Sequence, residues 1–343
     1  MFFKQNYNKT IERQDKMSVN ITRAGRAVLH VTDLEAAKKF YIDALGFFET
    51  ESTDDALYLR GYEEQDHHSI LLKKAEKPAV EVMSYKVYSD DELDKIEQIA
   101  KKHDLPYKWV EKGEQHAIGR AIRLQDVSGM PLEFYAEMKK VDSLLQRYDL
   151  YRGAHIQRID HLNCLVSDVQ KAYNFYNEVF GFRCSEYTED DEGQLWAIWT
   201  HRKGNVHDQA FMNGDGPLLH HIGFWLPEPA ALIHVCDVLA SMGMAHTIER
   251  GPGRHGLSNA FFLYLRDPDG HRIELYFGDY FTGDGDFEPK RWSVHDKTRQ
   301  TFWGHEAPDS WFDEASTFLH VITGEEVKVE KAKLELYKPD FTI

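Results

Sequence analysis

Apolar and polar residues alternate in several short stretches of the chain, and a segment with helical spacing follows each of them. The period of two that is typical of a strand occurs in EVMSYKVYS (81–89) and LLHHIGFWL (218–226). Apolar residues recur every three or four positions in the segments that follow, DELDKIEQIAKKH (91–103) and EPAALIHVCDVLASMG (228–243). The pattern predicts an α+β protein that repeats a strand, a helix and three or more further strands.

Two stretches of the chain resemble each other closely. They are VTDLEAAKKFYIDALGF (31–47) and VSDVQKAYNFYNEVFGF (166–182). In each, an apolar strand is followed by an aspartate, Asp33 or Asp168, at the position of a helix N-cap. A Gly-Phe pair then ends the amphipathic helix. The repeat predicts two modules of the same construction.

The ends of the two modules match as well. A glycine-containing turn leads into a strand that carries a glutamate in both DVSGMPLEFYAE (126–137) and DPDGHRIELYFG (267–278). The segment MKKVDSLLQRYDLYRGAH (138–155) between the modules is predicted to be a helix. Beyond residue 280, glycine, aspartate, proline and aromatic residues predict a long loop packed over the protein as a lid.

The chain is therefore expected to have five parts. These are a polar N-terminal leader at 1–23, an N-terminal module at 24–138, a linker at 139–154, a C-terminal module at 155–280 and a lid-like tail at 281–343. Met17 is an alternative start of the protein.

Charge and composition narrow the class of protein. The 57 acidic residues exceed the 41 Lys and Arg residues, giving a net charge of −16, so nucleic acid and anionic membranes would be repelled. No apolar run reaches the roughly 20 residues of a membrane helix, and the N-terminus lacks the apolar core of a secretory signal. The three cysteines have no CxxC spacing. These features favour a cytoplasmic protein.

The two modules differ at positions that could bind a metal. Alignment of the repeats places arginine and tyrosine in the first module opposite two histidines in the second, whereas a glutamate occupies the third position in both. The aligned pairs are Arg26 and His161, Tyr85 and His221, and Glu133 and Glu274. A single histidine in a strand is usually a core or surface residue, so only the three residues of the second module together favour a metal site. Two imidazoles and one carboxylate suit Fe(II), and Mn(II) accepts the same ligands.

A longer motif links the second module to a known family. A glycine stands two residues before a histidine, and an aliphatic-Tyr pair, Asp-Pro-x-Gly and a glutamate follow. The residues are Gly253, His255, Leu263, Tyr264, Asp267, Pro268, Gly270 and Glu274. With this motif, the region 155–305 resembles the extradiol ring-cleavage dioxygenases of the vicinal oxygen chelate superfamily, especially the 3,4-dihydroxyphenylacetate 2,3-dioxygenases. The resemblance implies a glyoxalase-like fold, in which each module is a pair of βαβββ units forming a curved, barrel-like mixed sheet.

The resemblance also implies roles for individual residues. His161, His221 and Glu274 would bind Fe(II) or Mn(II) in the C-terminal module, and the N-terminal module would bind no metal. His207 would be the acid and base, and Asn163 would lie beside the oxygen-binding position. Tyr264 and His255 would hydrogen-bond the substrate oxygens, Trp199 would form a wall of the pocket, and Arg250 and Arg299 would attract a substrate carboxylate.

Two further positions near these residues are His220 and Gln300. His220 adjoins the expected ligand His221, and because neighbouring residues of a strand point to opposite sides, His220 is assigned a structural or supporting role. Gln300 stands where the relatives tend to have a second arginine of an Arg-Arg pair. This difference leaves the preferred catechol open.

The function implied by the resemblance is extradiol cleavage of a catechol by O2. The expected substrate is 3,4-dihydroxyphenylacetate, giving 5-carboxymethyl-2-hydroxymuconate semialdehyde. One alternative is a catechol 2,3-dioxygenase that acts on uncharged catechols. Another is a member of the superfamily that is not an oxygenase, either an isomerase or a protein that binds an aromatic compound. The family resemblance further implies a homotetramer.

Overall fold

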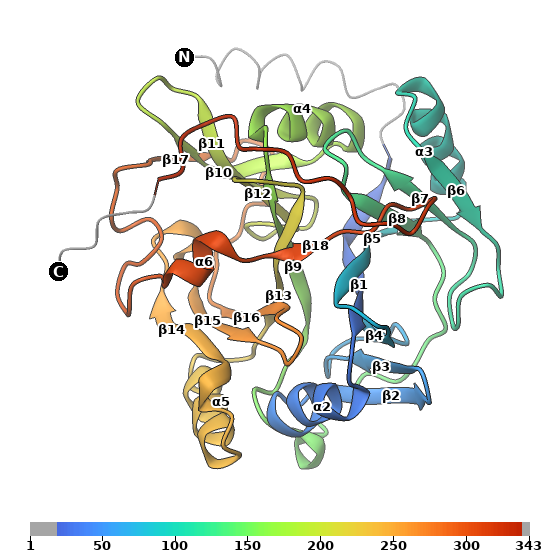
Figure 1. Cartoon of the computed structure of the whole chain (residues 1–343), viewed down its shortest axis with the longest axis vertical. Helices are drawn as coiled ribbons and strands as arrows, with labels where there is room; N and C mark the ends of the chain where they lie inside the picture. Colours follow the sequence, from blue (N-terminus) through green and yellow to red (C-terminus); the bar gives the residue numbers. More distant parts are fainter. Residues whose placement is uncertain (1–18, 338–343) are drawn as a thin grey trace.

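The computed structural model describes residues 19–337, which form two mixed sheets side by side (Figure 1). The first sheet has eight strands in the order β2-β3-β4-β1-β5-β8-β7-β6. Its strands are β1 (Ile21–Val31), β2 (Phe48–Thr53), β3 (Ala56–Arg60), β4 (Ile70–Lys74), β5 (Ala79–Val87), β6 (Tyr107–Val110), β7 (Ala121–Gln125) and β8 (Pro131–Tyr135).

The second sheet repeats this plan and has two further strands from the tail. Its order is β14-β15-β16-β13-β9-β12-β11-β10-β17, and β18 pairs with β13. Its strands are β9 (Arg158–Val166), β10 (Arg183–Glu189), β11 (Leu195–His201), β12 (Gln209–Asn213), β13 (Leu218–Trp225), β14 (Ile248–Arg254), β15 (Phe261–Arg266), β16 (Arg272–Phe277), β17 (Lys290–Ser293) and β18 (Ser316–Thr317).

One helix follows the first strand of each unit. The helices are α2 (Leu34–Lys38), α3 (Asp91–Lys102), α4 (Val169–Phe180) and α5 (Ala230–Ser241), with α6 (Asp309–Asp313) in the tail. Each sheet therefore consists of two βαβββ units, joined by antiparallel pairing of β1 with β5 and of β9 with β13. The predicted α+β class and the paired units are confirmed.

The predicted helix caps are present. The side chain of Asp33 accepts hydrogen bonds from the backbone N–H groups of Glu35 and Ala36, and Asp168 accepts one from Lys171. Gly181 ends α4 with a φ of 68°, in the left-handed region that glycine adopts without strain. In the first module, α2 continues as a π-helix over Lys39–Ala44.

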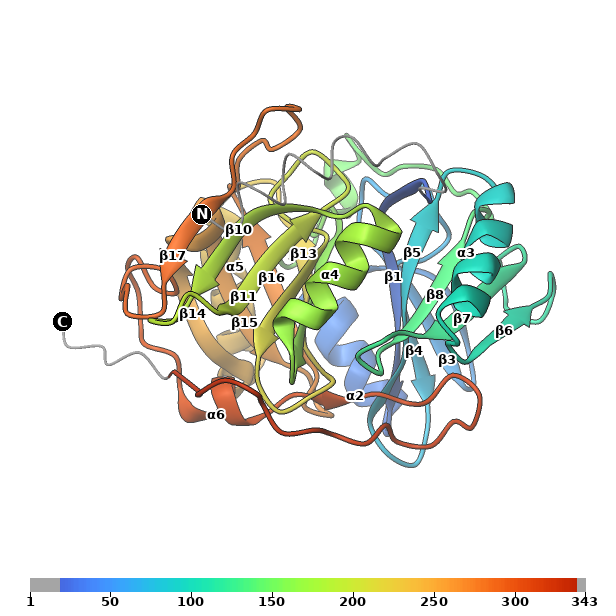
Figure 2. The ribbon, with the colours of Figure 1, turned by 90° about the horizontal axis from the view of Figure 1, so that it is seen from above.

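The helices α2 and α4 lie between the two sheets and join their cores (Figure 2). Phe47, which follows the first helix, packs edge-on against Phe224 of the second sheet, with ring centroids 4.7 Å apart. Phe180 at the end of α4 packs against Phe134 of the first sheet at 5.2 Å. Because the buried side chains of both modules form one continuous cluster, each module stabilises the other.

Two tyrosines make equivalent hydrogen bonds across this interface. Tyr41 donates to Asp267 in a turn of the second module, with an Oη to Oδ2 distance of 2.9 Å. Tyr176 of α4 donates to Asp126 in the corresponding turn of the first module at 3.2 Å. The aspartates begin the two glycine turns that match in sequence. The two copies of the sequence repeat therefore form equivalent hydrogen bonds, each to the other module.

The helix predicted for residues 138–155 is wrong. The structure has only a 3-10 turn at Tyr148–Leu150 in this segment. Backbone groups that a helix would pair internally bond instead to the first module; the N–H of Leu144 donates to the carbonyl of Tyr62 at 2.7 Å. Such long-range hydrogen bonds override a local helical spacing.

The N-terminal leader is predicted to reach residue 23, but the first strand begins before that residue. Residues 1–18, including the alternative start Met17, lie outside the described residues. Val19 is fully buried, and β1 begins at Ile21, so the last residues of the expected leader belong to the first sheet.

The tail crosses from the second module to the first (Figure 2). It pairs β17 with β10, passes through α6 and β18, and forms a bridge between Phe318 and Val80 of the first sheet. Among the described helices, none is both long enough and apolar enough to cross a membrane.

Candidate metal centre

Three side chains from neighbouring strands converge inside the second module. His161 lies on β9, His221 on β13 and Glu274 on β16, and all three are at most 3% exposed. His161 Nε2 is 2.7 Å and His221 Nε2 is 3.1 Å from Glu274 Oε2. Their potential ligand atoms all lie within 4.8 Å of one another. The structure brings together the three residues predicted to bind a metal.

The two ring nitrogens of His161 face two different carboxylates, Nδ1 facing Asp160 and Nε2 facing Glu274. Its Nδ1 is 2.9 Å from Oδ2 of the buried Asp160, which accepts a hydrogen bond. An N–H to carboxylate bond at one ring nitrogen orients the ring and makes the other nitrogen a stronger ligand. Burial would lower the pKa of His161, but its bonds to Asp160 and Glu274 raise that pKa to about 9. The two carboxylates therefore favour a positive charge at this position, between Asp160 and Glu274.

The Nδ1 of His221 is also held by a neighbouring side chain, in this case His220. His220 Nε2 donates to the carbonyl oxygen of Trp311 at 2.9 Å, because a carbonyl can only accept. Burial lowers the pKa of His220 well below its usual value, so the ring is neutral and its Nδ1 must accept. That atom is 2.7 Å from His221 Nδ1, which therefore donates. The Nε2 of His221 carries the lone pair that a metal needs.

The donor set fits Fe(II) or Mn(II). It offers two imidazole nitrogens and a carboxylate and has no sulfur ligand, as hard and borderline ions prefer. Burial lowers the pKa of His221 to about 4, so this ring is neutral near pH 7. Glu274 Oε1 is buried and has no hydrogen-bond partner among the described residues. These residues can hold a divalent cation without rearrangement of the sheet.

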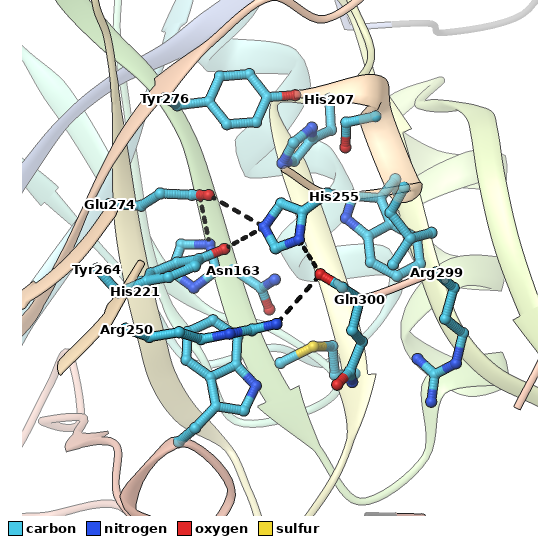
Figure 3. A pocket seen from close by; sticks show the side chains of 15 residues that line it. Asn163, His207, His221, Arg250, His255, Tyr264, Glu274, Tyr276, Arg299 and Gln300 are labelled. Atoms are coloured by element: carbon cyan, nitrogen blue, oxygen red, sulfur yellow. Dashed lines mark hydrogen bonds and ion pairs between the residues drawn. The ribbon is translucent and has the colours of Figure 1, made fainter. Parts of the chain in front are cut away.

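The pocket beside this centre contains every residue predicted to act on the substrate (Figure 3). His221 and Glu274 line it at one side. The predicted residues that line it with them are Asn163, Trp199, His207, Arg250, His255, Tyr264 and Arg299.

His207 lies just before β12 and faces the metal group. Its ring centroid is 3.9 Å from that of His161, the side chain is buried, and Nδ1 has no partner among the described residues. Burial and then the positive charge of His161 lower the pKa of His207 well below its usual value. A neutral imidazole with an unused nitrogen is suited to accept a proton from a substrate.

Tyr264 and His255 are connected by hydrogen bonds with fixed directions. His255 Nδ1 donates to the carbonyl oxygen of Gln300, so its Nε2 accepts from the hydroxyl of Tyr264, 2.9 Å away. His255 Nε2 is also 3.6 Å from Glu274 Oε1. Burial raises the pKa of Tyr264 well above its usual value, which keeps the hydroxyl protonated.

Two arginines in the pocket are buried, and neither forms an ion pair with an acidic side chain in the part of the chain that the structure describes. Arg250 is 2% exposed and donates to the carbonyl of Gln300 and the hydroxyl of Thr301, while its Nε and Nη1 have no partner among the described residues. Arg299 is 1% exposed; its Nε donates to Val294 O, and its Nη2 is unpartnered in the same part of the chain. Burial lowers the pKa of each to about 10. Both are therefore cations near pH 7, with free donors.

The first module has an ion pair at the corresponding place. Arg26 aligns with the ligand His161, and its Nη2 lies 2.5 Å from Oε1 of the fully buried Glu133. Arg123 binds the other oxygen of that carboxylate at 2.8 Å. The arginines supply the positive charge that a metal would supply in the second module.

The expected alignment of Tyr85 with His221 is wrong. In the first sheet, Ser84 pairs with Arg26 and Glu133. In the second sheet, Gly223 pairs with His161 and Glu274, so Ser84 and Gly223 occupy equivalent positions. The residue two positions earlier is Val82 in the first module and His221 in the second. Tyr85 instead donates a hydrogen bond to Gln209 of the second module at 2.6 Å. An apolar residue thus replaces the second histidine.

A further group of metal-binding residue types, Glu51, His67 and His116, lies in the first module. Its hydrogen bonds are complete without a metal. Arg26 can only donate to His68 Nε2, so His68 donates through Nδ1 to Nδ1 of His67, and His67 donates through Nε2 to Glu51. This arrangement places a proton on the nitrogen that would face an ion.

Asp160 and Trp311 support the histidines of the candidate metal centre through hydrogen bonds, and the sequence analysis did not single them out. Asp160 directly precedes His161, and a carboxylate next to a ligand histidine was a usable signal. Trp311 acts through its backbone carbonyl, which the identity of a side chain cannot reveal. The alternation rule for His220 and His221 also fails locally, because a bulge between β9 and β13 at Leu219 and His221 brings both rings together.

Comparison with known proteins identifies the class of the fold. The family model described as Glyoxalase/Bleomycin resistance protein/Dioxygenase superfamily matches residues 158–275. The model of the catechol 2,3-dioxygenase-like N-terminal domain matches residues 80–139.

Solved structures from Brevibacterium fuscum are similar over nearly the whole chain. An extradiol ring-cleaving dioxygenase is 39% identical with a TM-score of 0.91, covering 94% of this chain and 90% of that one. The anaerobic complex of homoprotocatechuate 2,3-dioxygenase with 3,4-dihydroxyphenylacetate is 40% identical with a TM-score of 0.89, covering 93% and 99%. The manganese-dependent 2,3-dihydroxybiphenyl 1,2-dioxygenase of Geobacillus genomosp. 3 is 29% identical over 300 residues, 84% of this chain and 95% of that protein.

The chain belongs to the family of extradiol ring-cleaving dioxygenases. The expected enzyme class is confirmed, which favours the oxygenase over the isomerase and the aromatic-binding protein.

Proposed function

We propose that the protein cleaves 3,4-dihydroxyphenylacetate with O2 to give 5-carboxymethyl-2-hydroxymuconate semialdehyde. His161, His221 and Glu274 hold the ion, Fe(II) or Mn(II). The observation that carries the proposal is that this group shares a pocket with two buried guanidinium groups, which form no ion pair within residues 19–337. One end of the pocket suits a catechol on a metal, and Arg250 and Arg299 suit a carboxylate.

An ion held by these three residues would supply a positive charge that makes the catechol more acidic and a centre for its reaction with O2. His207 accepts a proton from a catechol hydroxyl and later returns it to oxygen. Tyr264 and His255 hydrogen-bond the substrate oxygens, and Asn163 lies beside the position of O2. Trp199 closes one wall, so the aromatic ring is held away from water.

The reaction has a direct test. Protein loaded anaerobically with ferrous iron is given 3,4-dihydroxyphenylacetate and air. A yellow ring-cleavage product and consumption of one O2 per catechol are expected. A colourless mixture without oxygen uptake, with both Fe(II) and Mn(II), would rule the proposal out.

Catechol 2,3-dioxygenase activity is the second candidate. It is favoured by the match of residues 80–139 to the catechol 2,3-dioxygenase-like model and by the neutral Gln300 in the pocket. The variant Arg250→Met separates the two. It should weaken turnover of the acid selectively if Arg250 binds a carboxylate, whereas equal effects on catechol and the acid would favour the second candidate.

The oligomeric state, the cellular location and the binding partners of the enzyme are also part of the proposal. We infer a homotetramer in the cytoplasm, with a small catechol and O2 as its binding partners. Size-exclusion chromatography with light scattering measures the assembly, and cell fractionation measures the location.

A further inference from the structure

We propose that Gln300 selects a catechol whose side chain carries a hydroxyl group beside its carboxylate. This inference rests on the proposed ring cleavage and names the substrate class more closely. Gln300 is 6% exposed, lines the pocket, and its Oε1 has no hydrogen-bond partner among the described residues.

The backbone of Gln300 is firmly held. Its carbonyl oxygen accepts hydrogen bonds from Arg250 Nη2 at 3.1 Å and from Nδ1 of His255. Figure 3 shows the side chains of Gln300 and Arg299 on the side of the pocket away from Glu274, with the guanidinium of Arg250 directed toward them. The backbone of Gln300 is therefore fixed beside Arg250, and the side chain of Gln300 lines the same pocket as the two arginines.

Arg250, Arg299 and Gln300 together determine which substituent on the catechol ring can form hydrogen bonds in the pocket. Unpaired N–H groups remain on Arg250 and Arg299, and an unpaired acceptor remains on Gln300. An unsubstituted catechol leaves all of them unpaired, and a buried polar group without a partner is costly. A simple acetate side chain supplies acceptors for the two arginines but leaves Oε1 of Gln300 without a donor.

A substituent that adds a donor completes the set. An ammonium group would also donate to Gln300, but it would stand beside two buried guanidinium cations that repel it. A hydroxyl donates without charge. The side chain that fits is therefore short, ends in a carboxylate and carries a hydroxyl on the carbon next to it, as in 3,4-dihydroxymandelate.

Stereochemistry allows a sharp test, because only one enantiomer can direct its hydroxyl toward Gln300 while its carboxylate faces the arginines. The metal-loaded enzyme is assayed for kcat/KM with 3,4-dihydroxyphenylacetate and with each enantiomer of 3,4-dihydroxymandelate. A neutral hydrogen bond corresponds to a preference of about 3- to 10-fold in kcat/KM for one enantiomer.

The variants Gln300→Met and Gln300→Leu should bring the ratio of kcat/KM for the two enantiomers close to one. Lys297→Met, in the same stretch of the tail but outside the pocket lining, should keep the ratio.

The outcomes separate this inference from the proposed function. An equal rate for both enantiomers in the unmodified enzyme, or a ratio that persists in both Gln300 variants, would overturn the role of Gln300. Equal losses with all three acids in the Gln300 variants would do the same, because they would mean that the amide only assists the carboxylate. If the unmodified enzyme cleaves none of the three acids, the proposed function itself is wrong and the inference falls with it.

Discussion

His220 Nδ1 lies 2.7 Å from His221 Nδ1, and His220 takes its own orientation from the carbonyl of Trp311 in the tail. The tail thus helps to determine which nitrogen of a metal ligand carries the proton. The partner of His161 at the same position is a carboxylate, so the two ligand histidines are supported unequally.

Replacement of His220 should weaken metal binding. His220→Leu removes the acceptor for His221 Nδ1–H, and loss of such a supporting bond typically lowers metal affinity by about 10- to 100-fold. His220→Asn, whose side-chain oxygen can accept the same bond, should retain most of the affinity. Titration of Mn(II) followed by electron paramagnetic resonance measures both variants. Equal affinity in the leucine variant and the unmodified protein would show that His220 only fills space.

His207→Ala should lower kcat by about 10²- to 10⁴-fold, because it removes the buried imidazole whose ring lies 3.9 Å from that of His161 and whose Nδ1 has no partner among the described residues. Metal content should not change, since His207 is not one of the three converging ligands. Oxygen uptake and elemental analysis measure the two quantities. His295→Ala, at an exposed histidine, is the control. An unchanged rate in His207→Ala would remove its assigned role.

Arg26→Met should destabilise the first module. Glu133 is fully buried, and the Arg26 and Arg123 guanidiniums outweigh the effect of burial and hold its pKa at about 2. Breaking a buried pair by removing one partner costs about 3–5 kcal/mol in the free energy of unfolding. Urea denaturation measures it, and Arg147→Met, at an exposed pair, should change little. Equal stability of both variants would mean that Arg123 alone is sufficient for Glu133.

The buried Asp126 should make stability depend on pH. Burial raises its pKa in the folded protein to about 6, from about 3.9 in an unfolded chain, so the folded state favours the protonated carboxyl. The stability it contributes is fully present below about pH 4 and is lost as the pH rises through about 6.

Asp126→Asn keeps an uncharged group in the same turn. Relative to the unmodified protein, this variant should gain about 1–2 kcal/mol more at pH 8 than at pH 5. Thermal unfolding at the two pH values gives the comparison. A difference that is the same at both pH values would contradict a raised pKa for Asp126.

Much of the fold and most of the site could be predicted because the chain contains two copies of the same arrangement of strands and helices. The caps Asp33 and Asp168 and the glutamates Glu133 and Glu274 recur at matching places, so local patterns could be checked against each other. The metal group followed from the difference between the copies, since Arg26 is exchanged for His161.

The errors arose where long-range contacts decide the structure. The segment at 138–155 has helical spacing, but the first module supplies partners for its backbone. Comparison of the local sequences aligns Tyr85 with His221, whereas the pairing of strands makes Val82 the equivalent of His221. The carbonyl of Trp311 belongs to a distant tail, and no local pattern connects it with His220.

The guanidinium of Arg26 is joined to the chain by covalent bonds, whereas the ion of the second module must be acquired from solution and can be withdrawn again. A chelator can therefore act directly on only one half of a nearly symmetric molecule. In the other half, Arg26 and Arg123 balance the charge of Glu133 whether or not the ion is bound.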